Sequence, residues 1–124
     1  MQFDDADDYL NKASKHVDKA ISNLADYDNT GIYDAAWHAR SELECFTIIL
    51  ALKLEDDVEK PEMLKRVRVS SKDRKKDVLL ASAQSLLNNS TEAFGKKNFE
   101  DALKYSWRAK EMLTALIRLI KSKS

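Results

Sequence analysis

Residues 32–54 read IYDAAWHARSELECFTIILALKL, and this stretch decides the fold class. Small and apolar side chains recur in it at steps of three and four residues, which is the spacing of one face of an α-helix. That stripe consists of Ala35, Ala39, Leu43, Phe46 and Leu50. The last three turns add apolar residues around most of the circumference, so this end is expected to be central to the core or buried in an interface. The added residues are Cys45, Ile48, Ile49 and Leu52.

The same periodicity predicts three further helices, over residues 3–25, 72–94 and 98–122. A polar stretch at 26–31 ends the first helix, and a short turn at 95–98 separates the last two. Ser70 and Asp73 resemble a capping box and predict that the third helix starts near Ser71. Gly95 is placed to end that helix, and Asn98 to cap the fourth.

The architecture expected from these helices is all-α, in a single domain over residues 1–124. Two Gly and one Pro in 124 residues cannot supply the tight turns of a sandwich or barrel, which excludes an all-β fold. One helical hairpin covers about 3–54 and a second about 72–122, with residues 55–71 as the connection. Two such hairpins predict a four-helix up-and-down bundle.

The two hairpins also resemble each other. Sliding residues 32–53 against 99–120 pairs Ala35 with Ala102 and Glu44 with Glu111, whereas upstream Leu10 pairs with Leu80. Any two amphipathic helices in register give several such identities, so duplication and chance similarity both stay open.

The expected location is cytoplasmic, in a soluble protein. The single cysteine excludes a disulfide framework and a thiolate zinc site, which fits a reducing compartment. Cys45 stands in an apolar run and is expected to be an inert core thiol. The longest apolar stretch, residues 45–54, is too short to cross a bilayer, so no membrane partner is expected.

Charge is divided along the chain although 21 basic and 21 acidic residues balance overall. Residues 1–59 carry a net charge of −9 and residues 60–124 carry +9. The densest basic run consists of Lys65, Arg66, Arg68, Lys72, Arg74, Lys75 and Lys76. This run either binds a polyanion or pairs with the acidic half of the protein. Pairing is favoured because the run lacks interleaved aromatic residues for base stacking.

Catalytic patterns are scarce. No glycine-rich phosphate loop can be built from two isolated glycines, and no cofactor is expected. Asp34, His38 and Glu42 lie along one helical face at intervals of four residues. They lack the doubled Glu-x-x-His pattern of di-iron bundles, so we expect solvated carboxylate–imidazole pairs and no metal site. The expectation is a protein without enzymatic activity.

Large apolar and aromatic side chains indicate an interface. The candidate interface residues are Trp37, Ile48, Ile49, Leu52 and Trp107. Three of them crowd the wide apolar end of residues 32–54, which exceeds what one helical stripe can hide. A homodimer is therefore expected. The alternative for Trp37 and Trp107 is a half-buried ring that seals the bundle.

The stretch YDAAWHARSELECFTIILAL, residues 33–52, follows an alanine-containing helix and a polar turn, and it resembles the helical hairpin of HEPN domains. Residues 86–113, LLNNSTEAFGKKNFEDALKYSWRAKEML, resemble both that hairpin and a tetratricopeptide unit. HEPN families that cleave RNA carry Arg followed four to six residues later by His. Neither His16 nor His38 has such an Arg upstream, so the resemblance implies a noncatalytic member.

The function expected from the sequence is a noncatalytic helical interaction or scaffold module that self-associates. The alternative is an RNA- or nucleotide-binding HEPN-like protein that uses the basic run over residues 65–76.

Overall fold

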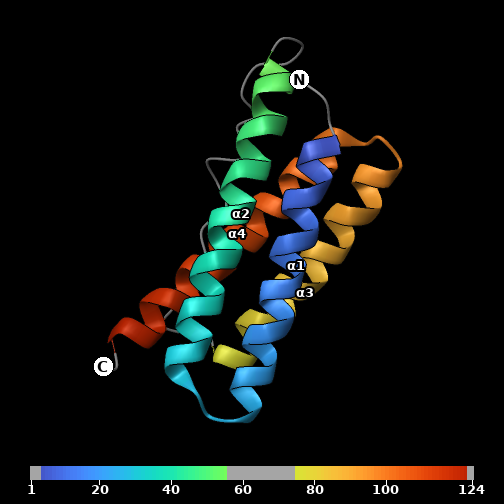
Figure 1. Ribbon diagram of the computed structural model, residues 1–124. Coiled ribbons are helices and arrows are strands. Elements are labelled where there is room, and N and C mark those ends of the chain that lie inside the picture. Colours follow the sequence, from blue (N-terminus) through green and yellow to red (C-terminus); the bar gives the residue numbers. More distant parts are fainter. Residues whose placement is uncertain (1–3, 56–74, 123–124) are drawn as a thin grey trace.

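The computed structural model describes residues 4–55 and 75–122, and within them the chain forms four α-helices and no strand. In chain order these are α1 (Asp4–Ala25), α2 (Asn29–Glu55), α3 (Lys76–Gly95) and α4 (Phe99–Ser122). Figure 1 shows two hairpins, α1 with α2 and α3 with α4, whose turns lie at opposite ends of the bundle. The all-α fold class predicted from the sequence is confirmed.

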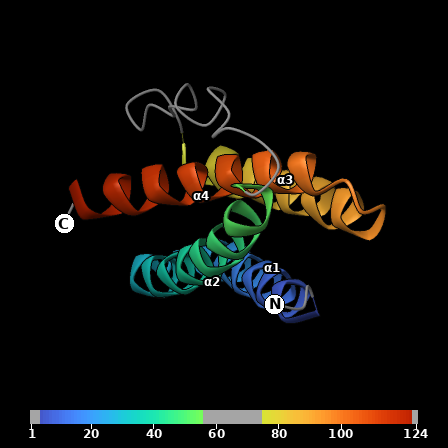
Figure 2. The ribbon, with the colours of Figure 1, turned by 90° about the horizontal axis from the view of Figure 1, so that it is seen from above.

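Each helix packs on two others. Besides its hairpin partner, α2 packs against α4 and α1 against α3. Neighbouring helices are antiparallel throughout (Figure 1), as expected for an up-and-down bundle. Viewed from above, the two hairpins form two layers that cross at an angle (Figure 2). The diagonal pairs, α1 with α4 and α2 with α3, make no close backbone contact within the described residues.

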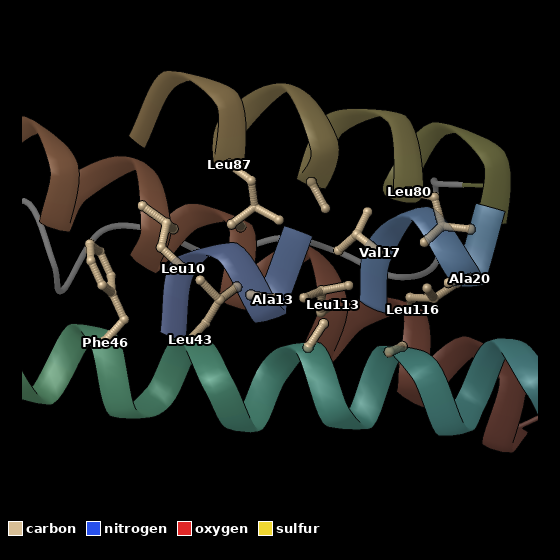
Figure 3. Close-up of a cluster of buried hydrophobic side chains, with 14 of the residues drawn as sticks. Leu10, Ala13, Val17, Ala20, Leu43, Phe46, Leu80, Leu87, Leu113 and Leu116 are labelled. Carbon is tan, nitrogen blue, oxygen red and sulfur yellow. The ribbon is translucent and has the colours of Figure 1, made fainter. Parts of the chain in front are cut away.

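The core lies where the four predicted stripes meet, and Figure 3 shows their side chains pointing toward one another. The fully buried large side chains of α1 and α2 are Leu10, Val17, Ile32, Leu43, Phe46 and Leu50. Those of α3 and α4 are Leu79, Leu80, Leu87, Leu113 and Leu116. Alanines fill many remaining core positions, and such small residues allow neighbouring helices to approach closely.

The first hairpin turn is a Schellman motif followed directly by a helix cap. The Tyr27 N–H donates to the Leu24 carbonyl (3.1 Å) and the Asp28 N–H to the Asn23 carbonyl (2.9 Å). Tyr27 takes the left-handed conformation, with φ of 56°. The carboxylate of Asp28 then accepts the Gly31 N–H at 3.0 Å, so Asp28 caps α2. This cap explains why α2 begins at Asn29, three residues earlier than predicted.

The second turn repeats this arrangement. The Lys97 N–H donates to the Phe94 carbonyl (3.0 Å) and the Asn98 N–H to the Ala93 carbonyl (2.8 Å). Lys97 is left-handed, with φ of 62°, and the Asn98 side chain accepts the Asp101 N–H at 3.4 Å. The predicted cap at Asn98 is confirmed.

Two predictions about α3 need correction. Gly95 does not supply the left-handed residue that ends α3; it is the last helical residue, and Lys97 takes that conformation. The helix begins at Lys76 instead of residue 72, because Lys75 is still extended. Ser70 and Asp73, on which the earlier start was based, lie outside the described residues.

The two turns show which residues of the hairpins correspond. Tyr27 corresponds to Lys97 and Asp28 to Asn98, so each residue of the first hairpin matches the residue 70 positions later in the second. Burial follows the same offset. The buried α2 residues Ile32, Ala36, Ala39, Leu43, Phe46, Thr47 and Leu50 correspond to buried Ala102, Ser106, Ala109, Leu113, Leu116, Ile117 and Ile120 of α4. The predicted match of Leu10 with Leu80 fits this offset. The predicted pairing of residues 32–53 with 99–120 is wrong by three positions, because sequence identity alone does not fix the turn.

Replacing the two glycines by alanine is expected to change the free energy of unfolding in opposite directions. A Cβ on Gly95 meets nothing within 4 Å, so Gly95→Ala is expected to raise the free energy of unfolding by about 0.5–1 kcal/mol through helix propensity. A Cβ on Gly31 would lie 2.5 Å from Asp28 Oδ2, in the carboxylate that caps α2. Gly31→Ala should therefore displace the cap and cost about 1 kcal/mol. Urea unfolding measures both, and equal responses would contradict this account.

Candidate functional site

One face of α2 points away from the core and carries several apolar side chains, beside the exposed Glu44. Trp37, Ser41, Cys45, Ile48 and Leu52 follow one another at steps of three and four residues, and we call them the outer stripe of α2. Its three large apolar side chains, Trp37, Ile48 and Leu52, are 48%, 53% and 52% exposed. Single exposed apolar residues are common on protein surfaces, whereas several on one helical face indicate a contact surface.

Cys45 of the outer stripe and the nearby Ile49 differ in their surroundings. Cys45 is exposed, so the prediction of a buried core thiol is wrong. Ile49, a predicted interface residue, instead packs partly buried against the core. Both results follow from the helical angle, because Cys45 lies between Trp37 and Ile48 on the outward side whereas Ile49 is turned toward the bundle.

The fold itself does not require an apolar face at this place. At the offset of 70 positions, the residues of α4 that correspond to Ile48 and Leu52 are Arg118 and Ser122. Arg118 is exposed, as a charged residue on the outer face of a surface helix should be. The same architectural position is thus polar in one hairpin and apolar in the other.

The two tryptophans occupy equivalent positions but differ in their surroundings. Trp107 is half-buried, and Lys110 Nζ lies 3.8 Å from the centre of its ring in a cation–π contact. Burial lowers the pKa of Lys110, while Glu44 and Glu111 raise it and Arg40 lowers it further. Trp107 thus packs with a lysine of its own helix, whereas Trp37 is more exposed, and the two predicted alternatives for these tryptophans stay predictions.

Next to the outer stripe, the two histidines of the chain face each other from different helices. The rings of His16 on α1 and His38 on α2 stack with centroids 5.3 Å apart and an interplanar angle of 25°. Trp37 contacts His38 as well: their ring centroids are 5.6 Å apart and the two rings meet edge-on. His38 Nε2 also lies 3.6 Å from Asp34 Oδ1, which is the solvated carboxylate–imidazole pair predicted on this face.

The environment of the pair favours the neutral form of His16. Burial lowers the pKa of His16 below its usual range, and His38 and Lys19 lower it further, while Glu42 and Asp34 raise it. Sequence reasoning missed His16 as the partner of His38. The available signal was their equal distance in sequence from Tyr27 at the hairpin turn, because such positions face each other in an antiparallel pair.

The basic run lies almost wholly outside the described residues, with Lys75 and Lys76 as its described members. Lys75 precedes the first residue of α3, and Lys76 Nζ donates to Asn29 Oδ1 at 2.6 Å. Lys76 thus ties the start of α3 to the start of α2. Lys65, Arg66, Arg68, Lys72 and Arg74 belong to the part of the chain that the structure does not describe.

The sequence matches no protein-family model, and it shows no significant similarity to curated proteins or solved structures. In the described ranges, no three His, Cys, Asp or Glu side chains gather where they could hold a metal ion. No helix within those ranges combines the length and apolar character needed to cross a bilayer.

Proposed function

We propose that this protein is a noncatalytic helical interaction module that self-associates through the outer stripe of α2. The observation that carries the proposal is that Trp37, Ile48 and Leu52 are each about half exposed on one face of α2, and that Ile48 and Leu52 stand where the equivalent hairpin has Arg118 and Ser122. Burying such a row against a second molecule removes apolar surface from water, which is the main driving force of association.

The second copy is the partner that this surface fits best. The stripe combines large side chains with the smaller Ser41 and Cys45 between them, and small residues allow two helices to approach closely. Most homodimers use one patch twice, so one apolar stripe per chain suffices to form a closed pair. An aromatic anchor such as Trp37 is typical of the residues that dominate interface energies.

The HEPN resemblance supports the class of this proposed function. A bundle of two helical hairpins is the architecture that the resemblance implies, and the Arg–His spacing of the RNA-cleaving families is missing around His16 and His38. We therefore propose a noncatalytic HEPN-like module. An exposed single cysteine fits a reducing compartment, and we place the protein in the cytoplasm.

The proposal is tested by measuring the mass of the chain in solution together with its affinity for RNA. Sedimentation velocity should show a species of twice the 14.2 kDa monomer that dissociates on dilution. Titration of labelled single-stranded RNA at about 50 mM salt should show weak or no binding. The matched variant replaces Arg66, Arg68, Arg74 and Lys75 by Ala.

The outcomes separate the two functions predicted from the sequence. Tight RNA binding that is lost in the quadruple variant, with the oligomer unchanged, would overturn the interaction module in favour of an RNA-binding protein. If the basic run instead pairs with the acidic half of the protein, the same four substitutions lower the thermal stability or disrupt the oligomer. A monomer at all concentrations contradicts self-association.

A further inference from the structure

We propose that the His16–His38 pair makes self-association sensitive to pH, so that acidification releases the dimer. This inference rests on the proposed function, because it concerns the regulation of the same surface. It starts from the geometry of three rings: His16 stacks on His38, and His38 contacts Trp37, the aromatic residue of the outer stripe.

The first step concerns His38 at the edge of the stripe. Its side chain is about half exposed in the single chain, so its charged form is hydrated there. A second copy that covers Trp37 also covers part of the neighbouring imidazole. Removing an imidazolium from water costs more than removing a neutral ring, so a second copy that covers Trp37 fits a neutral histidine pair better than a charged one.

The second step concerns His16, which lies behind His38. Two protonated rings whose centroids are 5.3 Å apart repel each other, and His16 is already disfavoured as a cation by its partial burial. Protonation of both rings therefore pushes His38 away from α1. Because Trp37 rests edge-on against His38, this movement also displaces the aromatic residue of the outer stripe.

The acidic groups around the pair oppose this effect but do not cancel it. Asp34 and Glu42 on α2 favour protonated histidine, while Lys19 on α1 adds to the repulsion. No charged group of α3, the other helix that packs on α1, is among those acting on His16. Asp34 is about two-thirds exposed, and exposed ion pairs contribute at most about 1 kcal/mol. The balance of these groups keeps the pKa of His16 lowered.

The sign of the stability effect follows from the lowered pKa of His16. A histidine whose pKa is lower in the folded state binds its proton better when unfolded, so the stability it contributes is present above about pH 6.5. That stability is lost as the pH falls through the folded-state value. This linkage concerns folding; release of the dimer is expected in the same range, below about pH 6.5, because that is where histidine takes up its proton.

The experiment compares sedimentation equilibrium at pH 7.5 and 5.5 for the wild-type chain and the double variant His16→Gln, His38→Gln. Glutamine keeps a polar side chain but cannot be protonated in this range. The wild-type dimer should weaken by about tenfold or more on acidification, while the double variant dimerises equally at both values. Circular dichroism should show the same helix content at both pH values, because the release takes place between folded chains.

A second measurement follows the coupling to the stripe directly. In a Trp107→Phe background, Trp37 is the sole tryptophan, and its fluorescence should change with a midpoint below about pH 6.5. Adding His38→Gln should abolish that change. Failure to dimerise at pH 7.5 overturns the proposed function and this inference with it. A dimer equally stable at pH 7.5 and 5.5, or a wild-type chain that loses its helices at pH 5.5, overturns the inference alone.

Discussion

The double variant Ile48→Arg, Leu52→Ser is expected to be monomeric at concentrations where the wild-type chain is a dimer. The two substitutions introduce the residues that α4 carries at the equivalent positions, Arg118 and Ser122. Burying one half-exposed aliphatic side chain contributes roughly 1 kcal/mol, so two such residues on each of two chains contribute roughly 4 kcal/mol. Their loss raises the dissociation constant by about three orders of magnitude, and the introduced charge raises it further.

The control for this variant is Val78→Ser, which removes an exposed apolar side chain of α3 that is outside the stripe. It should dimerise as the wild-type chain does. The free energy of unfolding of each variant, measured with urea, should equal that of the wild-type monomer within about 0.5 kcal/mol, since neither site is buried. If Val78→Ser dissociates the dimer and the double variant does not, the interface has been assigned to the wrong helix.

The variant Phe46→Ala is expected to lose about 3–5 kcal/mol of stability, a large part of the total for a domain of this size. Phe46 has no exposed surface, and its ring centroid lies 5.7 Å from that of Phe94 on α3. Phe94 in turn contacts Phe99 of α4 at 5.5 Å. These rings connect α2 to α3 across the bundle diagonal, where the backbones make no close contact. Truncation to alanine removes that connection and leaves a cavity.

The matched control is Phe46→Leu, because leucine is the residue that α4 uses at the equivalent position, Leu116. Leucine keeps most of the apolar volume, and its cost should be well below that of alanine. Urea unfolding followed by circular dichroism measures both variants. A loss of less than about 1 kcal/mol for Phe46→Ala would show that the aromatic cluster does not hold the diagonal together.

The fold could be predicted because its causes are local in sequence. The core positions repeat at helical spacing, and Asn98 caps α4 with a side chain whose role depends only on its neighbours. Asp28 caps α2 in the same way, and its place after Tyr27 could have predicted the earlier start of that helix.

The candidate site was less predictable because exposure depends on where the neighbouring helices lie. Cys45 and Ile49 stand in one apolar run, and its apolar character hid the difference in helical angle that turns Cys45 outward and Ile49 toward the bundle. The stacking of His16 on His38 depends on the register of the first hairpin, which the turn around Tyr27 determines. Left-handed Tyr27 and Lys97 are also unexpected, since that conformation usually favours glycine or asparagine.

The two-hairpin architecture has a consequence for how the chain folds. Contacts within each hairpin join residues that are close in sequence, whereas those of α1 with α3 and α2 with α4 join residues of different hairpins. Proteins dominated by local contacts fold fast, so each hairpin is expected to form before the two dock. Docking then requires bringing together Glu55 and Lys76, and the entropy cost of joining two chain positions grows only with the logarithm of the number of residues between them. Each doubling of that number of residues therefore costs only about 0.6 kcal/mol.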